Sequence, residues 1–506
     1  MAKTRSEKKA ILVRIVAIAL AVLLVGSILF SILPLFGLAE EEGRSHYALD
    51  MAVDLDAQAI AVTETIDYVN ATGRALNAVW LNVYANALRR TETVPVARDD
   101  WNDAFPAGYA PGGVDFISVT VDGAPADWAM SGAGETFMRV ACDAAPGAVV
   151  RIVLRFHLLL TKNNWALGLG DLGWRLTNFY PVAAAYDPAA EDFVLNSWTV
   201  AADPLMSDPA DYDVTLALPQ TYYVAATGVA EAAGPDTDGR VAWRVSAKNV
   251  RDFSLAFSRK MNVRAGETAS SLPVYACAST DAAAHAMLSA ALRAMNIYEG
   301  WLGGSALERL TLVEVDSAAA AAKPGLIQVP RALCGLTARQ ALAEEIARLC
   351  AKQWFGGEVG CNPENEPWLT DTLAEYAALL SFEEEEGYAA YLKRLNRQVL
   401  PSLQITIPGG VTVDSHASRF DDPDEYRLVV VDRGMAVLHE TRDLMGREAF
   451  IACLARYVAD NRGRIASIEQ FAAAANAVTG KRWDEYLVAQ MQTISDYVNQ
   501  QITWFE

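Results

Sequence analysis

Histidine is scarce in this 506-residue sequence, and its five copies stand at positions 46, 157, 285, 416 and 439. No two of them lie three to five residues apart, so the chain lacks the spacing that lets two imidazoles on one helix face hold a zinc ion. His439 and Glu440 begin such a pattern, but Asp443 and Leu444 follow where a second histidine would be needed. We expect the histidines to be ordinary surface or core residues, while a zinc site assembled from distant histidines and cysteines stays open.

Cysteine is also infrequent, with six residues at positions 142, 277, 334, 350, 361 and 453. None of them forms a CxxC pair, so the sequence shows no zinc-ribbon pattern. Cys350 and Cys361 could meet as a disulfide, but the free buried thiol is the commoner state and is the one we expect.

The sequence has no excess of basic residues, because 42 Lys and Arg stand against 62 Asp and Glu and give a net charge of −20. The acidic residues are spread along the chain instead of forming one block, which favours solubility and disfavours binding to nucleic acid. We therefore expect no nucleic-acid partner. With 52% hydrophobic residues, a chain of this length can bury a large core.

One long run without charge lies at the N-terminus, where residues 15–38 form 24 uncharged positions. About 20 apolar residues span the hydrocarbon core of a bilayer, so this run predicts a transmembrane helix. Five basic residues precede it within residues 1–14 and glutamates 40–42 follow it, which predicts a cytoplasmic tail at 1–14 and an extracytoplasmic remainder. A cleaved signal peptide is the alternative, but its apolar region usually has only about 7–15 residues.

Alternating apolar and polar residues dominate the chain from about residue 46 to 265, with Gly, Pro and Asp between the segments. This pattern predicts a large antiparallel β domain. Beyond residue 280 the period becomes helical, as in 281–303, 337–355 and 368–400, and one short strand is predicted at 307–316. The predicted fold class is therefore α+β, with a β domain at 46–265 and a mixed, mainly helical domain at 266–506.

Several longer phrases occur in order along both domains. They are NFYPVAAAYD (178–187), DPLMSDPADYDVTLALPQTYYVAATG (203–228), VRDFSLAFS (250–258), GLIQVP (325–330), QWFGGEVG (353–360), NEPWLTDTLAEY (365–376), DRGMAVLHETRDLMGREAF (432–450) and IEQFAAAANAVTGKRWDEYL (468–487). In this order they resemble the membrane alanyl aminopeptidase family of gluzincin zinc metallopeptidases, over residues 46–490.

The resemblance implies a saddle- or sandwich-like β domain followed by a thermolysin-like peptidase domain with a helical end. It also implies a zinc ion held by the two His of an HExxH helix and by a Glu nineteen residues beyond the second His. The Glu of the motif would activate a water molecule. A further Glu before PGL would grip the free amine of the substrate, and a Tyr would stabilise the oxyanion.

The positions of these catalytic residues carry other side chains in this chain. Counting back from QWF without gaps, the first His falls on Arg348, the catalytic Glu on Leu349 and the second His on Lys352. Nineteen residues further on, the third ligand falls on Asp371. The amine-gripping Glu falls on Ala322 and the Tyr on Val431. Only Asp371 keeps the chemistry of a metal ligand. The resemblance therefore implies a degenerate site, and we expect no metal or cofactor although the family uses zinc.

A second alignment frame is open, because LAEEIAR at 342–348 resembles LAHEIAH if LCAK is a four-residue insertion. This frame places Glu344, Glu345 and Arg348 at the motif positions and keeps the general-base Glu. Four residues are close to one helical turn, so both frames present nearly the same face. We favour the ungapped frame because it preserves the spacing to Asp371.

The helix that carries these residues also has an ordinary structural interpretation. Thr337 and Gln340 form a possible capping box, and Glu344, Arg348 and Lys352 form a row of charges that stabilises an exposed helix. In the family, however, the same row faces the zinc cleft. Losing a dication beside a carboxylate would leave a buried charge without compensation, so we predict an ion pair between Asp371 and Lys352 or Arg348.

Two other uses of this region were considered. Arg348 and Lys352 could instead bind an anion such as a peptide carboxylate, because Arg offers a fork of donors that matches it. Trp354 and Trp368 are expected to be core aromatics and not ligand platforms.

These observations predict a membrane-anchored, extracytoplasmic pseudopeptidase that binds peptides or a membrane protein partner, or acts as a scaffold. An active metallopeptidase with a displaced metal site, or one that uses another mechanism, is the alternative. A bare structural remnant, the third option, would have a cleft filled by its own side chains.

Overall fold

The computed structural model describes residues 43–493 except 237, 260 and 408. The predicted cytoplasmic tail and transmembrane helix, residues 1–14 and 15–38, lie outside the described residues. Within the described part of the chain, every helix is too short or too polar to cross a bilayer.

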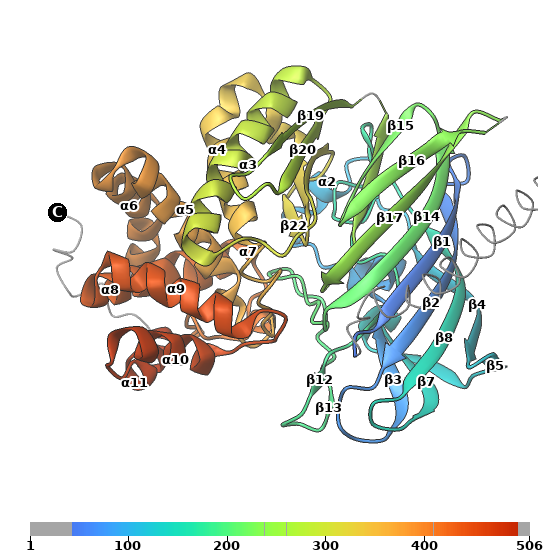
Figure 1. Ribbon diagram of the computed structural model, residues 1–506, viewed down its shortest axis with the longest axis horizontal. Coiled ribbons are helices and arrows are strands. Elements are labelled where there is room, and N and C mark those ends of the chain that lie inside the picture. Colours follow the sequence, from blue (N-terminus) through green and yellow to red (C-terminus); the bar gives the residue numbers. More distant parts are fainter. Residues whose placement is uncertain (1–42, 237, 260, 408, 494–506) are drawn as a thin grey trace, which may run out of the picture. The chain divides into compact units, whose positions relative to one another are not determined.

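A twisted eight-stranded sheet forms the backbone of the β domain, in the order β16-β17-β14-β1-β2-β8-β4-β5 (Figure 1). Its strands are β1 (His46–Asp54), β2 (Ala59–Val69), β4 (Gly113–Val121), β5 (Ala124–Pro125), β8 (Val149–Leu159), β14 (Ala210–Pro219), β16 (Val229–Pro235) and β17 (Arg240–Val250). Along β8 buried and less buried positions alternate, as the sequence period of two requires. The predicted antiparallel arrangement holds except between β1 and β14, which run parallel.

Smaller sheets cover this one. They are β15 (Tyr222–Ala226), β18 (Leu255–Arg259), β10 (Gly173–Leu176) and β9 (Gly168–Leu169) in one sheet; β11 (Val182–Ala183), β3 (Leu76–Asn82), β7 (Phe137–Ala144) and β6 (Trp128–Ser131) in another; and the hairpin β12 (Tyr186–Asp187) with β13 (Asp192–Phe193). Apolar side chains from these sheets form one core that extends from Tyr47 to Phe257 in sequence.

A five-stranded sheet begins the second part of the molecule, in the order β19-β20-β21-β23-β22. Its strands are β19 (Asn262–Glu267), β20 (Pro273–Ala278), β21 (Leu310–Val315), β22 (Ala321–Lys323) and β23 (Leu326–Pro330). The prediction of a single strand after residue 280 was wrong, because β22 has only three residues and β23 only five, which is too few to show a clear period of two. The predicted domain boundary at residue 265 falls inside β19, which pairs with β20.

Helices pack beside this sheet and fill the rest of the second part (Figure 1). The longer ones are α3 (Asp281–Leu302), α4 (Arg339–Ala351), α5 (Asp371–Glu386), α6 (Tyr388–Gln404), α8 (Gly434–Met445), α9 (Arg447–Asn461), α10 (Ile468–Thr479) and α11 (Asp484–Gln492). Their apolar faces join the sheet in a second core, which extends from Leu272 to Met491 in sequence. The short helices α2 (Trp101–Ala104) and α7 (Pro423–Tyr426) lie in connecting segments.

The start of α4 differs from the prediction. The helix begins after Ala338 without a side-chain cap, and the Gln340 side chain donates to Glu344 within the helix, 3.0 Å away. The predicted capping box of Thr337 and Gln340 is therefore wrong. A 3₁₀ turn at Leu336–Ala338 leads directly into α4, so Thr337 is not in the extended conformation that a cap residue requires.

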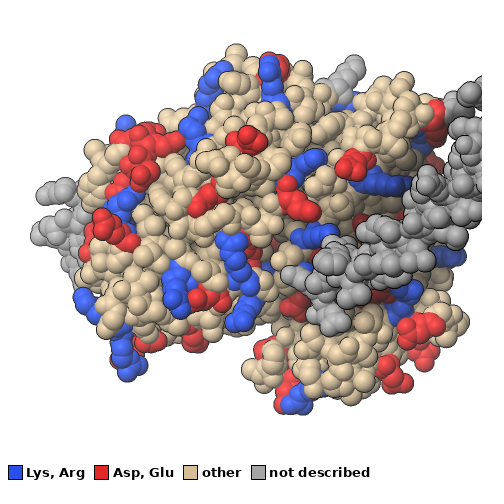
Figure 2. All heavy atoms as spheres, viewed as in Figure 1, with Lys and Arg blue, Asp and Glu red and all other residues tan. Residues whose placement is uncertain are grey.

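The two parts of the molecule are joined by a small third cluster of buried residues. Ala225 and Ala256 from β15 and β18 pack there against Val313 and Leu326 from β21 and β23. The sheet face of the β domain is thus fixed against the five-stranded sheet, and the edge strand β22 comes to lie near the β domain. On the face shown in Figure 2, acidic and basic side chains are interspersed over the described surface.

Candidate functional site

A cavity of about 390 Å³ lies where the two parts of the molecule meet. The β domain contributes residues 198–207 and Asp252 to its wall, and the second part contributes β22, the end of α4 and the start of α5. Trp165 and Trp198 form an aromatic corner, with ring centroids 5.1 Å apart in an edge-to-face arrangement. Several residues that the sequence selects, among them Ala322, Arg348, Lys352 and Asp371, line this one cavity.

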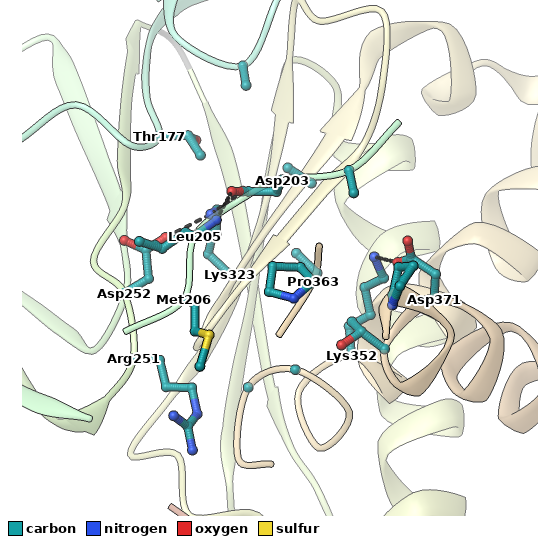
Figure 3. Close-up of a pocket in the computed structure, with 18 of the residues that line it drawn as sticks. Thr177, Asp203, Leu205, Met206, Arg251, Asp252, Lys323, Lys352, Pro363 and Asp371 are labelled. Atoms are coloured by element: carbon teal, nitrogen blue, oxygen red, sulfur yellow. Dashed lines mark hydrogen bonds and ion pairs between the residues drawn. The ribbon is translucent and has the colours of Figure 1, made fainter. Parts of the chain in front are cut away.

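Lys352 and Asp371 form the ion pair predicted from the sequence. The Lys352 Nζ lies 2.5 Å from Asp371 Oδ1, and each side chain is 21% exposed (Figure 3). Lys352 immediately follows α4 and Asp371 is the first residue of α5, so the pair connects the two helices. Burial by itself would raise the pKa of the Asp371 carboxyl, but Lys352 and a hydrogen bond from Tyr426 hold it below its ordinary value.

Tyr426 is a site residue that the sequence analysis missed. Its hydroxyl donates to Asp371 Oδ2 at 2.6 Å, so both carboxylate oxygens of Asp371 have partners. The sequence analysis placed the Tyr position on Val431, which is 5% exposed and packs in the hydrophobic core. Tyr426 immediately precedes a π-helical turn at Arg427–Arg433, and Val431 lies within that turn.

Arg348 is held by acids of its own helix and of α5. Its guanidinium donates to both oxygens of Glu345, at 2.5 and 3.0 Å, and lies 3.7 Å from Glu375. The predicted row of Glu344, Arg348 and Lys352 is not formed, because Glu344 instead pairs with Arg394 and Arg397 of α6. Glu344 is thus engaged by α6, whereas Lys352 forms the ion pair with Asp371.

The anion-binding use of Arg348 and Lys352 receives little support from this geometry. Each cation already has a carboxylate partner within 2.5 Å. Burial would lower the pKa of Arg348, but Glu345 and the neighbouring acids raise it above its ordinary value, so the group stays charged. An incoming carboxylate would have to compete with Glu345 and Asp371 for the same donors.

The remaining predicted positions are apolar. Leu349 is 1% exposed and belongs to the core of the second part. Ala322 lies in the edge strand β22 and is partly buried at the cavity wall. Neither side chain can hold a proton, a metal or an amine.

Lys323 is the second site residue that the sequence analysis did not single out. Its ammonium lies 2.6 Å from Asp203 and 2.8 Å from Asp252 (Figure 3). It also donates to Asn178 Oδ1 at 3.3 Å. The Lys323 side chain is 9% exposed. Burial by itself would lower its pKa, but the two aspartates raise it above the ordinary value of lysine, so the group is an ammonium at neutral pH. Its only signal in the sequence was a lone charge in SAAAAAKPGL, beside Ala322.

The donor set at the predicted metal positions does not fit a zinc ion. Zinc takes neutral imidazole, thiolate or carboxylate ligands, whereas Arg348 and Lys352 are cations and Leu349 is apolar. Asp371 has ligand chemistry, but both of its oxygens are engaged by Lys352 and Tyr426. Within residues 43–493, as far as the structure describes them, no cluster of three or more His, Cys, Asp or Glu side chains is placed to hold a metal ion.

The other predictions for this region concern packing. Trp354 and Trp368 are fully buried in the core, as predicted. The six cysteines are free thiols, so Cys350 and Cys361 are not joined. His439 is buried and shares a hydrogen bond of 2.7 Å with the Tyr391 hydroxyl, which makes it a core residue.

Comparison with known proteins agrees with the family that the phrases predict. Residues 317–496 match the peptidase family M1 domain. The M1 zinc metallopeptidase from Deinococcus radiodurans has a similar fold, with a TM-score of 0.62, 16% identity, and coverage of 90% of this chain and 94% of that chain. A variant of it bound to a Tyr-Ser-Ala substrate gives a TM-score of 0.61 at 15% identity, covering 90% of this chain and 95% of that chain.

A two-domain M1 zinc metallopeptidase variant bound to L-tryptophan also matches, with a TM-score of 0.62, 16% identity, and coverage of 90% of this chain and 95% of that chain. The comparison with curated proteins gave no significant match. The zinc-dependent metallopeptidases share the architecture described above, a large β domain followed by a mixed and then helical domain. Residues 317–496 are therefore similar to the peptidase family M1 domain, and the fold of the chain is similar to that of M1 zinc metallopeptidases.

Proposed function

We propose that this protein is a membrane-anchored, extracytoplasmic pseudopeptidase that keeps the M1 fold but has lost zinc and peptide hydrolysis. Its remaining role is to bind peptides or a protein partner at the cavity between its two parts. The observation that carries the proposal is the ion pair of Lys352 and Asp371, which stand at the second-His and third-ligand positions of the ungapped frame.

Physical chemistry supports the loss of zinc. A dication beside Lys352 and Arg348 would be repelled by two fixed positive charges that are only partly screened, because both side chains are about four-fifths buried. Asp371 alone is too few ligands for a zinc site, which uses three protein ligands in enzymes and four in structural centres. Without a metal, the chain has no imidazole or carboxylate at position 349 to activate water.

Binding of a peptide is supported by the form of the cavity. The strand β22 is the edge of its sheet, and an edge strand offers backbone donors and acceptors to an extended chain. The aromatic corner of Trp165 and Trp198 offers an apolar contact surface in the same cavity. The similar zinc metallopeptidases bind Tyr-Ser-Ala and L-tryptophan, which makes short peptides the first ligands to test.

Membrane attachment is supported by the sequence of residues 1–38. The basic residues before the uncharged run and the acidic residues after it favour an N-terminus in the cytoplasm and a domain outside it. Protease protection of the folded domain in intact cells, with cleavage of a tag placed before residue 1, would agree with the reverse orientation and would contradict this part of the proposal.

The test of the pseudopeptidase uses the purified full chain. Metal content is measured after dialysis against zinc-containing buffer, and turnover is measured with aminoacyl p-nitroanilides, with and without a chelator. We expect no stoichiometric zinc and no turnover. Stoichiometric zinc with chelator-sensitive turnover would establish the alternative, an active metallopeptidase with a displaced site.

A matched variant shows whether the assay can detect a restored site. Arg348→His, Leu349→Glu, Lys352→His and Asp371→Glu together rebuild the motif in the ungapped frame, and this variant is expected to bind one zinc ion. The control, Glu344→His with Arg348→His, rebuilds the alternative frame and is expected to bind none, because position 344 faces Arg394 and Arg397. Zinc in the control and not in the first variant would show that the gapped frame is correct.

A further inference from the structure

Lys323 is surrounded by oxygen atoms in the way that a bound ammonium ligand would be. Its Nζ donates to Asp203 Oδ2 at 2.6 Å and to Asn178 Oδ1 at 3.3 Å, and forms an ion pair with Asp252 Oδ2 at 2.8 Å. The three oxygens come from the β domain, whereas Lys323 reaches them from β22 in the second part. The ammonium therefore enters a site that another part of the chain builds.

The oxygen site is held in place by contacts of its own. The Asn178 amide donates to both oxygens of Asp203, at 3.1 and 3.2 Å, and the backbone N–H of Leu205 donates to Asp203 Oδ1 at 3.1 Å. Tyr180 donates to Asp252 Oδ1 at 3.5 Å. None of these contacts involves Lys323, so the site can keep its geometry when the lysine side chain is removed.

The site carries more negative than positive charge. Two carboxylates and one ammonium leave a net charge of −1. The Asp252 side chain is 5% exposed, while the Asp203 side chain is 41% exposed and lines the cavity. Asp203 thus connects the buried part of the site to the cavity, and a small cation can reach it from there.

We propose that Asp203, Asp252 and Asn178 form a binding site for a primary ammonium group, and that Lys323 occupies this site as a tethered internal ligand. The chain thereby closes this corner of the cavity to ligands with a free amine. Lys323 follows Ala322, the position where the family's amine-gripping Glu would stand, so the corner presents the chain's own ammonium and no free carboxylate for an external one.

Tethering explains why Lys323 prevails over ligands in solution. A group fixed on a strand beside its site acts at an effective concentration of about millimolar or more, whereas a free amine must give up translational freedom to bind. The Lys323 ammonium is the ion-pair partner of both Asp203 Oδ2 and Asp252 Oδ2, so an external ammonium has to displace it from these oxygens. The site is therefore closed in the wild type and becomes available only when the lysine side chain is shortened.

The test replaces the tether with a free ligand. Lys323→Ala removes three methylenes and the ammonium, which together correspond to n-propylammonium. Binding of n-propylammonium chloride to the full chain is measured by calorimetry, and its effect on the midpoint of thermal unfolding is measured in parallel. We expect affinity for the variant to be at least about tenfold higher than for the wild type, with a rise of Tm in the variant only.

Two probes separate this site from general effects of salt or solvent. 1-Propanol has the same carbon chain without the charge, and tetramethylammonium has the charge without N–H donors. Both are expected to leave the Tm of Lys323→Ala unchanged at concentrations where n-propylammonium raises it. Equal effects of all three compounds, or equal binding of n-propylammonium by wild type and variant, would overturn the proposal.

A second variant keeps the test decisive if Lys323→Ala does not fold. Lys323→Ala with Asp252→Asn removes the more buried carboxylate and leaves Asp203 and Asn178 to hold the ligand. This variant is expected to bind n-propylammonium more weakly than the single variant would but more tightly than the wild type, and further replacement of Asp203 by Asn is expected to abolish binding. Binding that survives the loss of Asp203 would place the amine elsewhere and contradict the proposal. The result does not depend on whether the cavity binds peptides.

Discussion

The two ends of the cavity balance a carboxylate with a lysine, but with different numbers of partners and different depths. At one end Lys352 meets the single carboxylate of Asp371, and both side chains are one-fifth exposed. At the other end Lys323 meets two carboxylates, Asp203 and Asp252, and is 9% exposed. The first pair is neutral and joins two helices of one domain, whereas the second keeps a net negative charge and joins the two parts of the molecule.

This difference shows what decides the cost of breaking each contact. Removing one partner of a buried pair leaves a charge that neither water nor protein compensates, and the cost grows with burial and with the number of charges left behind. Near the surface, water replaces the lost partner and the cost is small. We therefore expect the Lys352–Asp371 pair, which the sequence predicts, to contribute less to stability than the contacts of Lys323 with Asp203 and Asp252, which the sequence did not single out.

The largest expected effect is that of Lys323→Met, which keeps the length of the side chain and removes its charge. Two aspartates then face each other without an ammonium, and we expect the free energy of unfolding to fall by about 3–5 kcal/mol. Denaturant unfolding measures the change. Lys393→Met, at an exposed position of α6, serves as the matched control and is expected to change stability by less than about 0.5 kcal/mol.

The same experiment has an internal check. Adding Asp252→Asn to Lys323→Met removes one of the two stranded charges and should restore part of the lost stability. If the double variant is no more stable than Lys323→Met, the loss comes from packing of the lysine stem and not from charge.

Lys352→Met is expected to have a smaller effect, about 1–3 kcal/mol, because Asp371 keeps its hydrogen bond from Tyr426 and some contact with water. A double-mutant cycle with Asp371→Asn isolates the coupling between the two side chains. A coupling energy near zero would show that the pair is formed without contributing to stability.

The pH dependence of this pair follows from the lowered pKa of Asp371. Since the pKa in the folded state lies below the unfolded value of about 3.9, the pair contributes its stability above that pH and loses it as pH falls through the folded value. The stability difference between wild type and Asp371→Asn should therefore shrink below about pH 4. A difference that stays constant down to pH 2 would contradict this assignment.

Glu366 supplies a third case for the comparison, a carboxylate of the same tract whose pKa is shifted in the opposite direction. Burial, with Glu469 and Asp414 nearby, raises the pKa of Glu366 to about 7 although its Oε1 accepts the Ile468 N–H at 2.8 Å. Because the folded state holds this proton more tightly, stability should decrease as pH rises from about 4.5 to about 7.

Glu366→Gln keeps an acceptor for Ile468 and removes the charge. The variant should be more stable than the wild type above pH 7, by about 1 kcal/mol after screening by solvent, and equally stable near pH 4. Thermal unfolding across this range measures the difference. A wild-type chain whose stability does not decrease between pH 5 and 7 would show that Glu366 titrates normally.

The predictions that held depend on regular local structure. The spacing from Lys352 to Asp371 is set by one helix end, one ordered turn and the next helix start, so counting residues was enough to place the two side chains together. Burial of Trp354 and Trp368 followed from their place in apolar helical periods. The order of the β domain before the helical part followed from the change of period near residue 280.

The predictions that failed depend on long-range contacts or on irregular backbone. Glu344 was expected beside Arg348, but α6 brings Arg394 and Arg397 to it from about fifty residues away. The residue near Asp371 is Tyr426 and not Val431, because Tyr426 just before the irregular π-helical turn reaches the carboxylate while Val431 within the turn packs in the core. The strands β22 and β23 were missed because strands of three and five residues are too short to show a clear alternation.

The sequence by itself predicted the resemblance to the aminopeptidase family, the two-part α+β architecture and the side chains at the positions that align with the family's catalytic residues. These features follow from the order of the residues and from the spacing of apolar residues along the chain, and neither depends on contacts between residues far apart in the sequence. The tertiary structure alone decided how each charge is balanced. Asp203 and Lys323 are 120 residues apart and meet only because the β domain packs against the edge strand of the next sheet. Coulomb energy depends on distance and burial in space, and sequence separation fixes neither of them.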